Sequence, residues 1–265
     1  MLKAGLIGYG SIGKEIESLI SKGKAGHVKL LTVLTRSEQH ETSSDSLITT
    51  KPETFFEQDL DIVIEAAGHK ALHTYGAKVL SSGADLLILS TGALADIELY
   101  DSLHQTAKEH ACKIYIPSGA IAGLDRIAAG SLGMIDEVKL ITSKPVKSWY
   151  GTIAEKQVDL ETITEPHCLF EGSAREAAGL FPESVNAAAT LSISGIGVEH
   201  TKVLVYIDPT IHSNVHKIIA VGDFGKLEVS IENHPSKINP KSSPVVAMSV
   251  AKVLRNLTQE IVVGV

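Results

Sequence analysis

Three glycines near the N-terminus have the spacing that binds the phosphates of a nucleotide. Gly8, Gly10 and Gly13 form a G-x-G-x-x-G motif, with Ser11 and Ile12 before the last glycine. The first glycine permits a tight turn, the second lets the backbone approach a pyrophosphate, and the third allows a helix to pack closely on a strand. The free N–H groups at the start of that helix would donate to the phosphates. We expect a dinucleotide here; the alternative is a glycine-rich turn that only packs a helix.

The flanking residues supply the strand and the helix that such a turn requires. Residues 4–7 are apolar and predict a buried strand, and the apolar residues of 12–20 recur at helical spacing. Further strands are predicted at 28–34, 61–65, 86–89 and 113–116, with helices at about 71–81 and 97–109. Strands that alternate with helices predict an α/β fold, a Rossmann doubly wound parallel sheet.

Small and polar residues follow the predicted strands, at the carboxyl edge where such sheets bind ligands. They are Ala67, Gly68, Ser90, Thr91, Ser118, Gly119 and Ala120. Each alone could be turn chemistry, but together they predict a rim that faces the cofactor.

The end of the second strand bears on the choice of cofactor. An NAD site usually has Asp or Glu there to bind the ribose hydroxyls, whereas this strand is followed by Thr35-Arg36-Ser37. Arg36 could hold the 2′-phosphate of NADP through charge-assisted hydrogen bonds, or it could be a solvated surface arginine. We expect NAD or NADP as the cofactor, with NADP used at least as well as NAD.

The pattern changes after residue 120. A helix is predicted at 121–132, strands at 138–143, 202–207, 216–221 and 226–231, a helix from near Pro182, and a last apolar helix at 245–257, while residues 152–167 give no clear pattern. We predict a smaller α+β substrate domain over residues 121–239 with an antiparallel or mixed sheet. Residues 240–265 are predicted to rejoin a Rossmann domain of residues 1–120.

Three polar residues of the second half could serve a reaction. Arg175 could clamp a substrate carboxylate or form an ion pair with Glu176 or Glu183. Asn186 has apolar neighbours and needs partners, which could be a nicotinamide carboxamide or local backbone. His216 opens a predicted strand and could act as an acid or base near neutral pH, or be a buried structural histidine. The competing histidines are His200, His212 and His234.

Composition excludes several classes of function. The 265 residues include 44% hydrophobic and 21% charged residues, and the formal net charge of −7 argues against non-specific nucleic-acid binding. The two cysteines do not make a disulfide framework, and no paired ligand spacing predicts a metal site. No apolar run reaches about 18 residues, and no signal peptide is recognisable. We expect a cytoplasmic protein that binds neither nucleic acid nor membrane.

Several longer blocks resemble the L-aspartate dehydrogenase family. They are the glycine motif and residues 118–125, 170–177, 181–190, 208–209 with 214–216, and 239–243, spread over nearly the whole chain. The resemblance implies a Rossmann domain with a smaller α+β domain, and a homodimer or higher homo-oligomer. It implies NAD(P)-dependent oxidation of L-aspartate to iminoaspartate, which either hydrolyses to oxaloacetate and ammonia or supplies quinolinate and NAD synthesis.

The resemblance also implies roles for single residues. It places cofactor contacts at Ala120 and Asn186 and the catalytic histidine at His216. One departure is that Glu183 and Ser184 stand where the family often has Gln-Asn.

Aspartate brings two carboxylates that must be held. The candidate ligands are Lys144, His167, Ser173 and Arg175. The sequence does not choose among them. The alternatives in function are a related reductase of another small carboxylic acid and a nucleotide-sensing protein without turnover.

Overall fold

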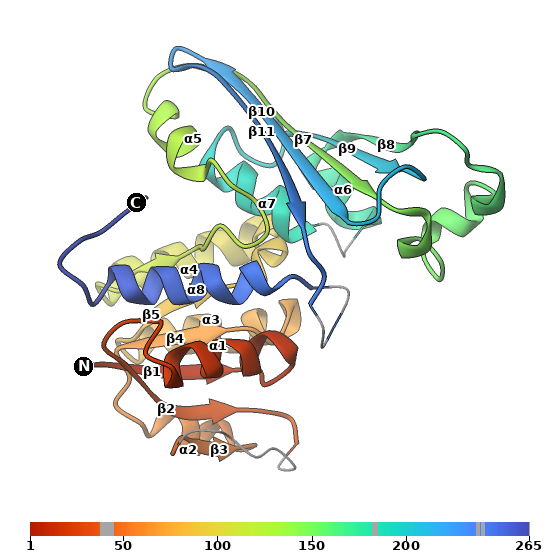
Figure 1. The fold of residues 1–265 in the computed structure, drawn as a ribbon. Coiled ribbons are helices and arrows are strands. Elements are labelled where there is room, and N and C mark those ends of the chain that lie inside the picture. Colours follow the sequence, from red (N-terminus) through yellow and green to blue (C-terminus); the bar gives the residue numbers. More distant parts are fainter. Residues whose placement is uncertain (38–44, 182–184, 237–238, 240–241, 265) are drawn as a thin grey trace. The chain divides into compact units, whose positions relative to one another are not determined.

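The structure is a computed structural model that describes residues 1–37, 45–181, 185–236, 239 and 242–264 (Figure 1). The chain forms two compact units. The first unit consists of Met1–Gly119 with Ser236–Val265, and the second unit is Ala120–Pro235. Each unit has its own hydrophobic core.

The first unit is built on a six-stranded parallel sheet with the strand order β3-β2-β1-β4-β5-β6. The strands are β1 Leu2–Ile7, β2 Val28–Leu34, β3 Leu47–Thr49, β4 Ile62–Glu65, β5 Asp85–Ile88 and β6 Ile114–Tyr115. All four residues of β4 are buried, because helices cover both faces of a doubly wound sheet. The predicted Rossmann sheet is confirmed.

Five α-helices and the 3₁₀ helix Thr91–Ala95 lie in the described part of the first unit. The α-helices are α1 Ser11–Ser21, α2 Pro52–Phe56, α3 His69–Ser81, α4 Ile97–Glu109 and α8 Pro244–Asn256. The last of them, α8, packs against α1, and its buried residues Val250 and Leu254 join the core that holds Ile16 and Ile20. Helix α8 thus contributes to the core of the first unit. The short β3 and α2 were not predicted.

The second unit has a mixed five-stranded sheet with the order β11-β10-β7-β9-β8. Its strands are β7 Ile135–Lys144, β8 His167–Ser173, β9 Lys202–Ile207, β10 Asn214–Gly222 and β11 Gly225–Asn233. Only β7 and β9 pair in parallel among these described strands. The helices are α5 Leu124–Gly130, α6 Ala174–Leu180 and α7 Val185–Ser194. Ile127 of α5 and Leu191 of α7 share a core with the sheet residues Leu140, Val205 and Ile218.

Several boundaries differ from the prediction: β7 begins at Ile135 rather than at residue 138, and β8 and α6 were not predicted. Helix α5 begins at Leu124 rather than at residue 121, because Gly123 before it has a left-handed conformation with φ of +79°. Residues 152–167 include two single 3₁₀ turns, Ile153–Lys156 and Leu160–Thr162, which give no periodic pattern. The predicted helix start at Pro182, the family departures Glu183 and Ser184, and Pro240 lie outside the described residues.

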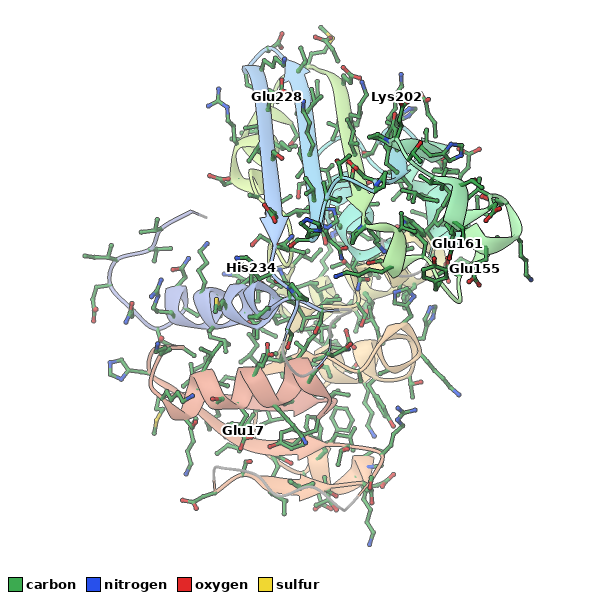
Figure 2. All side chains as sticks on the ribbon, turned by 45° about the vertical axis from the view of Figure 1, so that its right-hand side comes forward. Glu17, Glu155, Glu161, Lys202, Glu228 and His234 are labelled. Atoms are coloured by element: carbon green, nitrogen blue, oxygen red, sulfur yellow. The ribbon has the colours of Figure 1, made fainter. Side chains whose placement is uncertain are left out.

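The β10–β11 hairpin carries a surface ion-pair network. The Glu228 carboxylate lies 2.7 Å from Lys217 Nζ and 2.7 Å from Lys226 Nζ (Figure 2). The two lysines lower the pKa of Glu228 to about 2. These exposed pairs are worth little stability. Lys217 alternates with the buried residues of β10, whereas Lys226 and Glu228 belong to β11.

No helix in the described part of the chain is both long enough and apolar enough to cross a membrane.

Candidate active site

The turn after β1 requires a glycine at its start. Gly8 has φ of +99°, and a Cβ there would lie 2.6 Å from the carbonyl oxygen of Ala66. Its N–H donates to the carbonyl oxygen of Leu34 at 2.9 Å, which fixes the turn at the edge of the sheet. Any other side chain would push the turn away from the loop that follows β4.

The other two glycines have different surroundings. A Cβ on Gly13 would lie 2.3 Å from the carbonyl oxygen of Gly8, so α1 contacts the turn closely. Gly10 faces open space, with none of the described atoms within 4 Å of its Cβ position. It precedes α1 without a side-chain cap, and the first turn of α1, which begins with Ser11 and Ile12, carries no acidic residue. This N-terminus fits a phosphate group.

A buried pair holds the middle of the glycine turn on α1. Tyr9 is buried, and its hydroxyl donates to the carboxylate of Glu17, which is also buried. Burial and the contact with Glu17 raise the pKa of Tyr9. Lys14 Nζ lies 5.5 Å from the centre of the Tyr9 ring. This pair was not predicted; the signal for it is a tyrosine inside the motif with a glutamate on the predicted apolar face of the helix.

A second buried carboxylate organises the predicted cofactor rim. Glu65, the last residue of β4, accepts hydrogen bonds from the N–H groups of Ala67 and Gly68 and from the N–H and hydroxyl of Ser90. The sequence alone predicts only that Glu65 lies in a strand. Its signal is an acidic residue at the end of an otherwise apolar, buried strand.

Two further rim segments are placed in the first unit. Arg36 follows β2 and its side chain is exposed. The N–H of Gly119, after β6, donates to Ser249 Oγ of α8 at 3.2 Å. The C-terminal helix therefore holds the last loop of the carboxyl edge.

His216 occupies the buried face of the second sheet, near its end. It is the third residue of β10 and pairs with Thr142 of β7, whose Oγ1 lies 3.0 Å from Nδ1. The side chain of His216 is 7% exposed. Burial and then the charge of Lys144 lower the pKa of His216 to about 4, so the ring is neutral at pH 7. Among the described residues, none is recorded as a partner of Nε2.

Lys144 is the cation of this cluster. It ends β7 two residues after Thr142, so the two side chains share the buried face. Lys144 is 7% exposed, and its ammonium lies 5.2 Å from the centre of the Trp149 ring. Trp149 Nε1 donates to the backbone carbonyl of Lys144 at 3.3 Å. A nearly buried cation beside a neutral imidazole is suited to an anionic substrate.

Strand register separates the remaining substrate candidates. His167 and Lys144 both pair with Ile207 of β9, so they lie at the same end of the sheet. Ser173 pairs with Lys202, which pairs with Lys139 of β7. Lys139 is five residues from Lys144, so Ser173 lies roughly 16 Å along the strands from the His167 end.

Ser173 and Arg175 have structural partners at that other end. Ser173 caps α6 in a capping box with Glu176: its hydroxyl accepts from the Glu176 N–H at 3.2 Å and contacts the Glu176 carboxylate at 2.8 Å. Arg175 Nε donates to the carboxylate of Glu199, and both side chains are exposed. Glu199 is thus a further pair partner beside the predicted Glu176 and Glu183, of which Glu183 lies outside the described residues.

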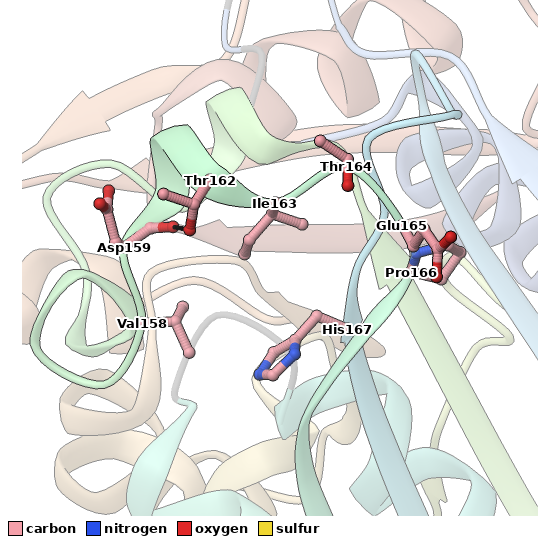
Figure 3. A pocket seen from close by; sticks show the side chains of 8 residues that line it. All are labelled: Val158, Asp159, Thr162, Ile163, Thr164, Glu165, Pro166 and His167. Atoms are coloured by element: carbon pink, nitrogen blue, oxygen red, sulfur yellow. Dashed lines mark hydrogen bonds between the residues drawn. The ribbon is translucent and has the colours of Figure 1, made fainter.

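An open groove of about 450 Å³ lies beside His167 (Figure 3). Its lining is Val158, Asp159, Thr162, Ile163, Thr164, Glu165, Pro166 and His167. The groove carries two carboxylates and one imidazole, so its polar lining does not match a dicarboxylate.

The two residues that the resemblance assigns to the cofactor also belong to the second unit. Asn186 is the second residue of α7, and its side chain is exposed rather than enclosed by apolar neighbours. The carbonyl oxygen of Ala120 accepts from Asn233 Nδ2 at 2.9 Å. Within the described residues there is no group of three or more His, Cys, Asp or Glu side chains that could hold a metal ion.

The fold and the glycine turn define a class. Residues 8–117 match the family model described as the NAD-binding domain of homoserine dehydrogenase. A parallel sheet of this strand order with a glycine-rich turn after β1 is the dinucleotide-binding fold, and the chain is an NAD(P)-binding oxidoreductase.

The second unit narrows the class to a family. Residues 125–257 match the model of the aspartate dehydrogenase C-terminal domain. The chain is 40% identical to the L-aspartate dehydrogenase of Methanosarcina acetivorans over 100% of both chains, and 35% identical to that of Serratia proteamaculans over 97% of both. The crystal structure of aspartate dehydrogenase from Thermotoga maritima superposes with a TM-score of 0.82 at 27% identity, covering 99% of each chain. This chain belongs to the L-aspartate dehydrogenase family.

Proposed function

We propose that the protein is an NAD(P)-dependent L-aspartate dehydrogenase that oxidises L-aspartate to iminoaspartate. The observation that carries the proposal is the buried, neutral His216 beside the buried cation Lys144. It lies in the unit that matches the aspartate dehydrogenase C-terminal model.

The first unit would hold the cofactor. Gly8, Gly10 and Gly13 with the N-terminus of α1 fit a pyrophosphate, because the turn leaves open space over Gly10. When bound, NAD(P) accepts the hydride from the substrate Cα.

His216 is proposed as the base. With a pKa of about 4, its ring is unprotonated at neutral pH and can take a proton from the substrate ammonium or from the water that attacks the imine. This role requires the tautomer in which Nδ1–H donates to Thr142 Oγ1, because Nε2 then presents its lone pair. Thr142 thus orients the ring and selects the tautomer.

Lys144 is proposed to bind one substrate carboxylate. Its charge lowers the pKa of His216, so pairing with a carboxylate would weaken that effect and raise the basicity of His216 when substrate is present. His167 lies at the same end of the sheet and is the second candidate, whereas Ser173 and Arg175 lie at the far end.

One assay tests the reaction. NAD(P)H formation at 340 nm is measured with aspartate and with a panel of other amino acids, for both cofactors. We expect aspartate to be the preferred substrate. Equal turnover of another small acid, or none with any amino acid, would contradict the proposal.

A matched pair of variants tests the carboxylate ligand. Lys144→Met should raise the KM for aspartate at least tenfold, because it removes a charge-assisted bond, while the KM for the cofactor changes little. Lys202→Met is the control, since Lys202 is exposed at the opposite end of the sheet (Figure 2). An equal rise of the KM for aspartate in both variants would mean that Lys144 does not bind the substrate.

The proposal includes a homodimer or higher homo-oligomer that acts in the cytoplasm. Cys112 and Cys168 are free thiols, the form that a reducing compartment maintains. Light scattering should give a multiple of the 28.2 kDa chain mass. A monomer at micromolar concentration would contradict the oligomer.

A further inference from the structure

Glu65 is a buried carboxylate that the proposed reaction does not use. Its side chain is 1% exposed. Oε1 accepts from Ala67 N at 2.7 Å, from Gly68 N at 2.9 Å and from Ser90 Oγ at 3.0 Å, and Oε2 accepts from Ser90 N at 3.1 Å. One side chain therefore ties together the loop after β4 and the loop after β5.

The charge of Glu65 is compensated by these donors. None of the described Lys, Arg or His side chains forms an ion pair with it. A buried carboxylate without a cation is costly unless several N–H and O–H groups point at it. The two loops must therefore keep the backbone conformation that supplies those donors.

The loop after β4 is also in contact with the glycine turn. Glu65 pairs with Ile7 of β1 on one side and with Ile88 of β5 on the other. Ala66 N donates to the Ile7 carbonyl at 2.8 Å, and the Ala66 carbonyl oxygen occupies the space that a Cβ on Gly8 would enter. The conformation that Glu65 fixes thus extends to the phosphate-binding turn.

These loops lie on the half of the sheet that serves the nicotinamide. In a dinucleotide-binding fold, the acid that binds the adenosine ribose follows β2, so β1–β3 hold the adenosine half and β4–β6 hold the other half. The loops after β4 and β5 are on that second half.

We propose that Glu65 is a positioning residue of the cofactor site, which presets the loops after β4 and β5 for the nicotinamide half of NAD(P). The inference rests on the proposed function for the presence of the cofactor. In this arrangement Ala67, Gly68 and Ser90 offer the cofactor a backbone surface of fixed shape. Their N–H groups are not available to the cofactor, because they already donate to Glu65.

Two variants remove different parts of the arrangement, and a third is the control. Glu65→Gln keeps an oxygen for Ala67 and Gly68 but places an NH₂ group against the N–H of Ser90. Ser90→Ala removes only the hydroxyl donor. Thr32→Val is the matched control: it removes a buried hydroxyl in the middle of β2 that bonds to the Leu47 carbonyl, far from the carboxyl ends of β4 and β5.

The readout is NADH affinity by fluorescence titration without aspartate, with the melting temperature and the steady-state KM values. Glu65→Gln should weaken NADH binding roughly tenfold and raise the KM for the cofactor more than that for aspartate. Ser90→Ala should weaken binding a few-fold, and it decides the question if Glu65→Gln does not fold. Thr32→Val should lower the melting temperature and leave NADH affinity unchanged.

Wild-type NADH affinity in a folded Glu65→Gln or in Ser90→Ala would overturn the inference, whatever happens to stability. Failure of the proposed function gives a different result. Wild-type protein would then bind NADH without oxidising aspartate, and the titration series would still decide the role of Glu65. Wild-type protein that binds neither NADH nor NADPH would overturn both.

Discussion

Glu65 in the first unit and His216 in the second are both buried, titratable residues near the end of a sheet, yet they are surrounded differently. Both oxygens of Glu65 accept hydrogen bonds, and all four donors come from two loops. His216 has one ring nitrogen beside Thr142, and no partner of its other nitrogen is recorded in the described part of the chain. Glu65 has neutral donors, whereas His216 lies near the charge of Lys144.

This difference in surroundings indicates different roles: Glu65 positions backbone, whereas His216 can take part in proton transfer. A carboxylate that accepts from three backbone N–H groups and a hydroxyl fixes the conformation of that backbone. A ring with an unoccupied nitrogen, made neutral by burial and a nearby cation, keeps one atom for proton transfer. We therefore expect changes at Glu65 to alter cofactor binding and changes at His216 to alter turnover.

The largest expected effect is the loss of the proposed base. His216→Asn should lower turnover about 10²–10⁴-fold, which is typical for a positioned acid–base group, while NADH affinity stays near the wild-type value. His212→Asn is the control, because His212 is exposed in the connection before β10. Wild-type turnover in His216→Asn would mean that His216 is not the base, and that it does not differ from Glu65 in taking part in the chemistry.

The pH dependence of stability tests the environment of His216. Its pKa is about 4 in the folded protein and 6.5 ordinarily, so between these values the unfolded chain binds the proton and the folded protein does not. The contribution of neutral His216 to the free energy of unfolding is fully present above about pH 6.5. It falls by roughly 3 kcal/mol as the pH decreases to about 4.

The measurement is denaturant unfolding of wild type and His216→Asn at several values of pH. The stability difference between them should shrink by about that amount from pH 7 to pH 4. A constant difference would mean that His216 is not held neutral by its surroundings.

The glycines of the turn offer a contrast within one motif. Gly13→Ala should destabilise the protein by roughly 1–3 kcal/mol, since its Cβ would lie 2.3 Å from a carbonyl oxygen. Gly10→Ala meets open space and has an ordinary φ of −78°, so the melting temperature should hold while the KM for the cofactor rises about tenfold. Unchanged cofactor affinity in Gly10→Ala would mean that phosphates do not approach this turn.

The smallest expected effect concerns Arg36. If it binds the 2′-phosphate, Arg36→Ala should lower kcat/KM for NADP several-fold and leave the value for NAD unchanged. Exposure and salt reduce the effect below that of a buried pair. A strong wild-type preference for NAD, or an equal loss of kcat/KM for both cofactors, would mean that Arg36 is a solvated surface residue that does not bind the 2′-phosphate.

Elements with a strong local signal could be predicted from the sequence. The predicted strand at 28–34 and helix at 97–109 match β2 and α4 to the residue. Strand β2 consists mainly of Val and Leu, interrupted by Lys29 and Thr32. Helix α4 begins after Asp96, which caps it by accepting from the N–H groups of Glu98 and Leu99. The short β3 and α2 lack such signals, because three and five residues are too few for a period to show.

The candidate site was predictable where it depended on local pattern and not where it depended on register. The conformational demands of Gly8 and Gly13 follow from the motif. That Lys144 and His167 lie at one end of the sheet, and Ser173 at the other, depends on the parallel pairing of β7 with β9, which spacing does not give. The role of Glu65 depends on two loops, of which the second places Ser90 beside it from 25 residues further along the chain. The capping box at Ser173 could have been found from its Ser-x-x-Glu spacing.

The return of α8 to the first unit has a consequence for synthesis on the ribosome. The first core is complete only when Ala247, Val250 and Leu254 cover α1, and Thr258 Oγ1 accepts from the His27 N–H across 231 residues of sequence. A nascent chain of the first 119 residues therefore exposes apolar surface that α8 later buries. The second unit is continuous and can fold earlier. Newly made chains should accordingly complete the nucleotide site only after α8 has been made, and a chain truncated after Pro235 should bind chaperones.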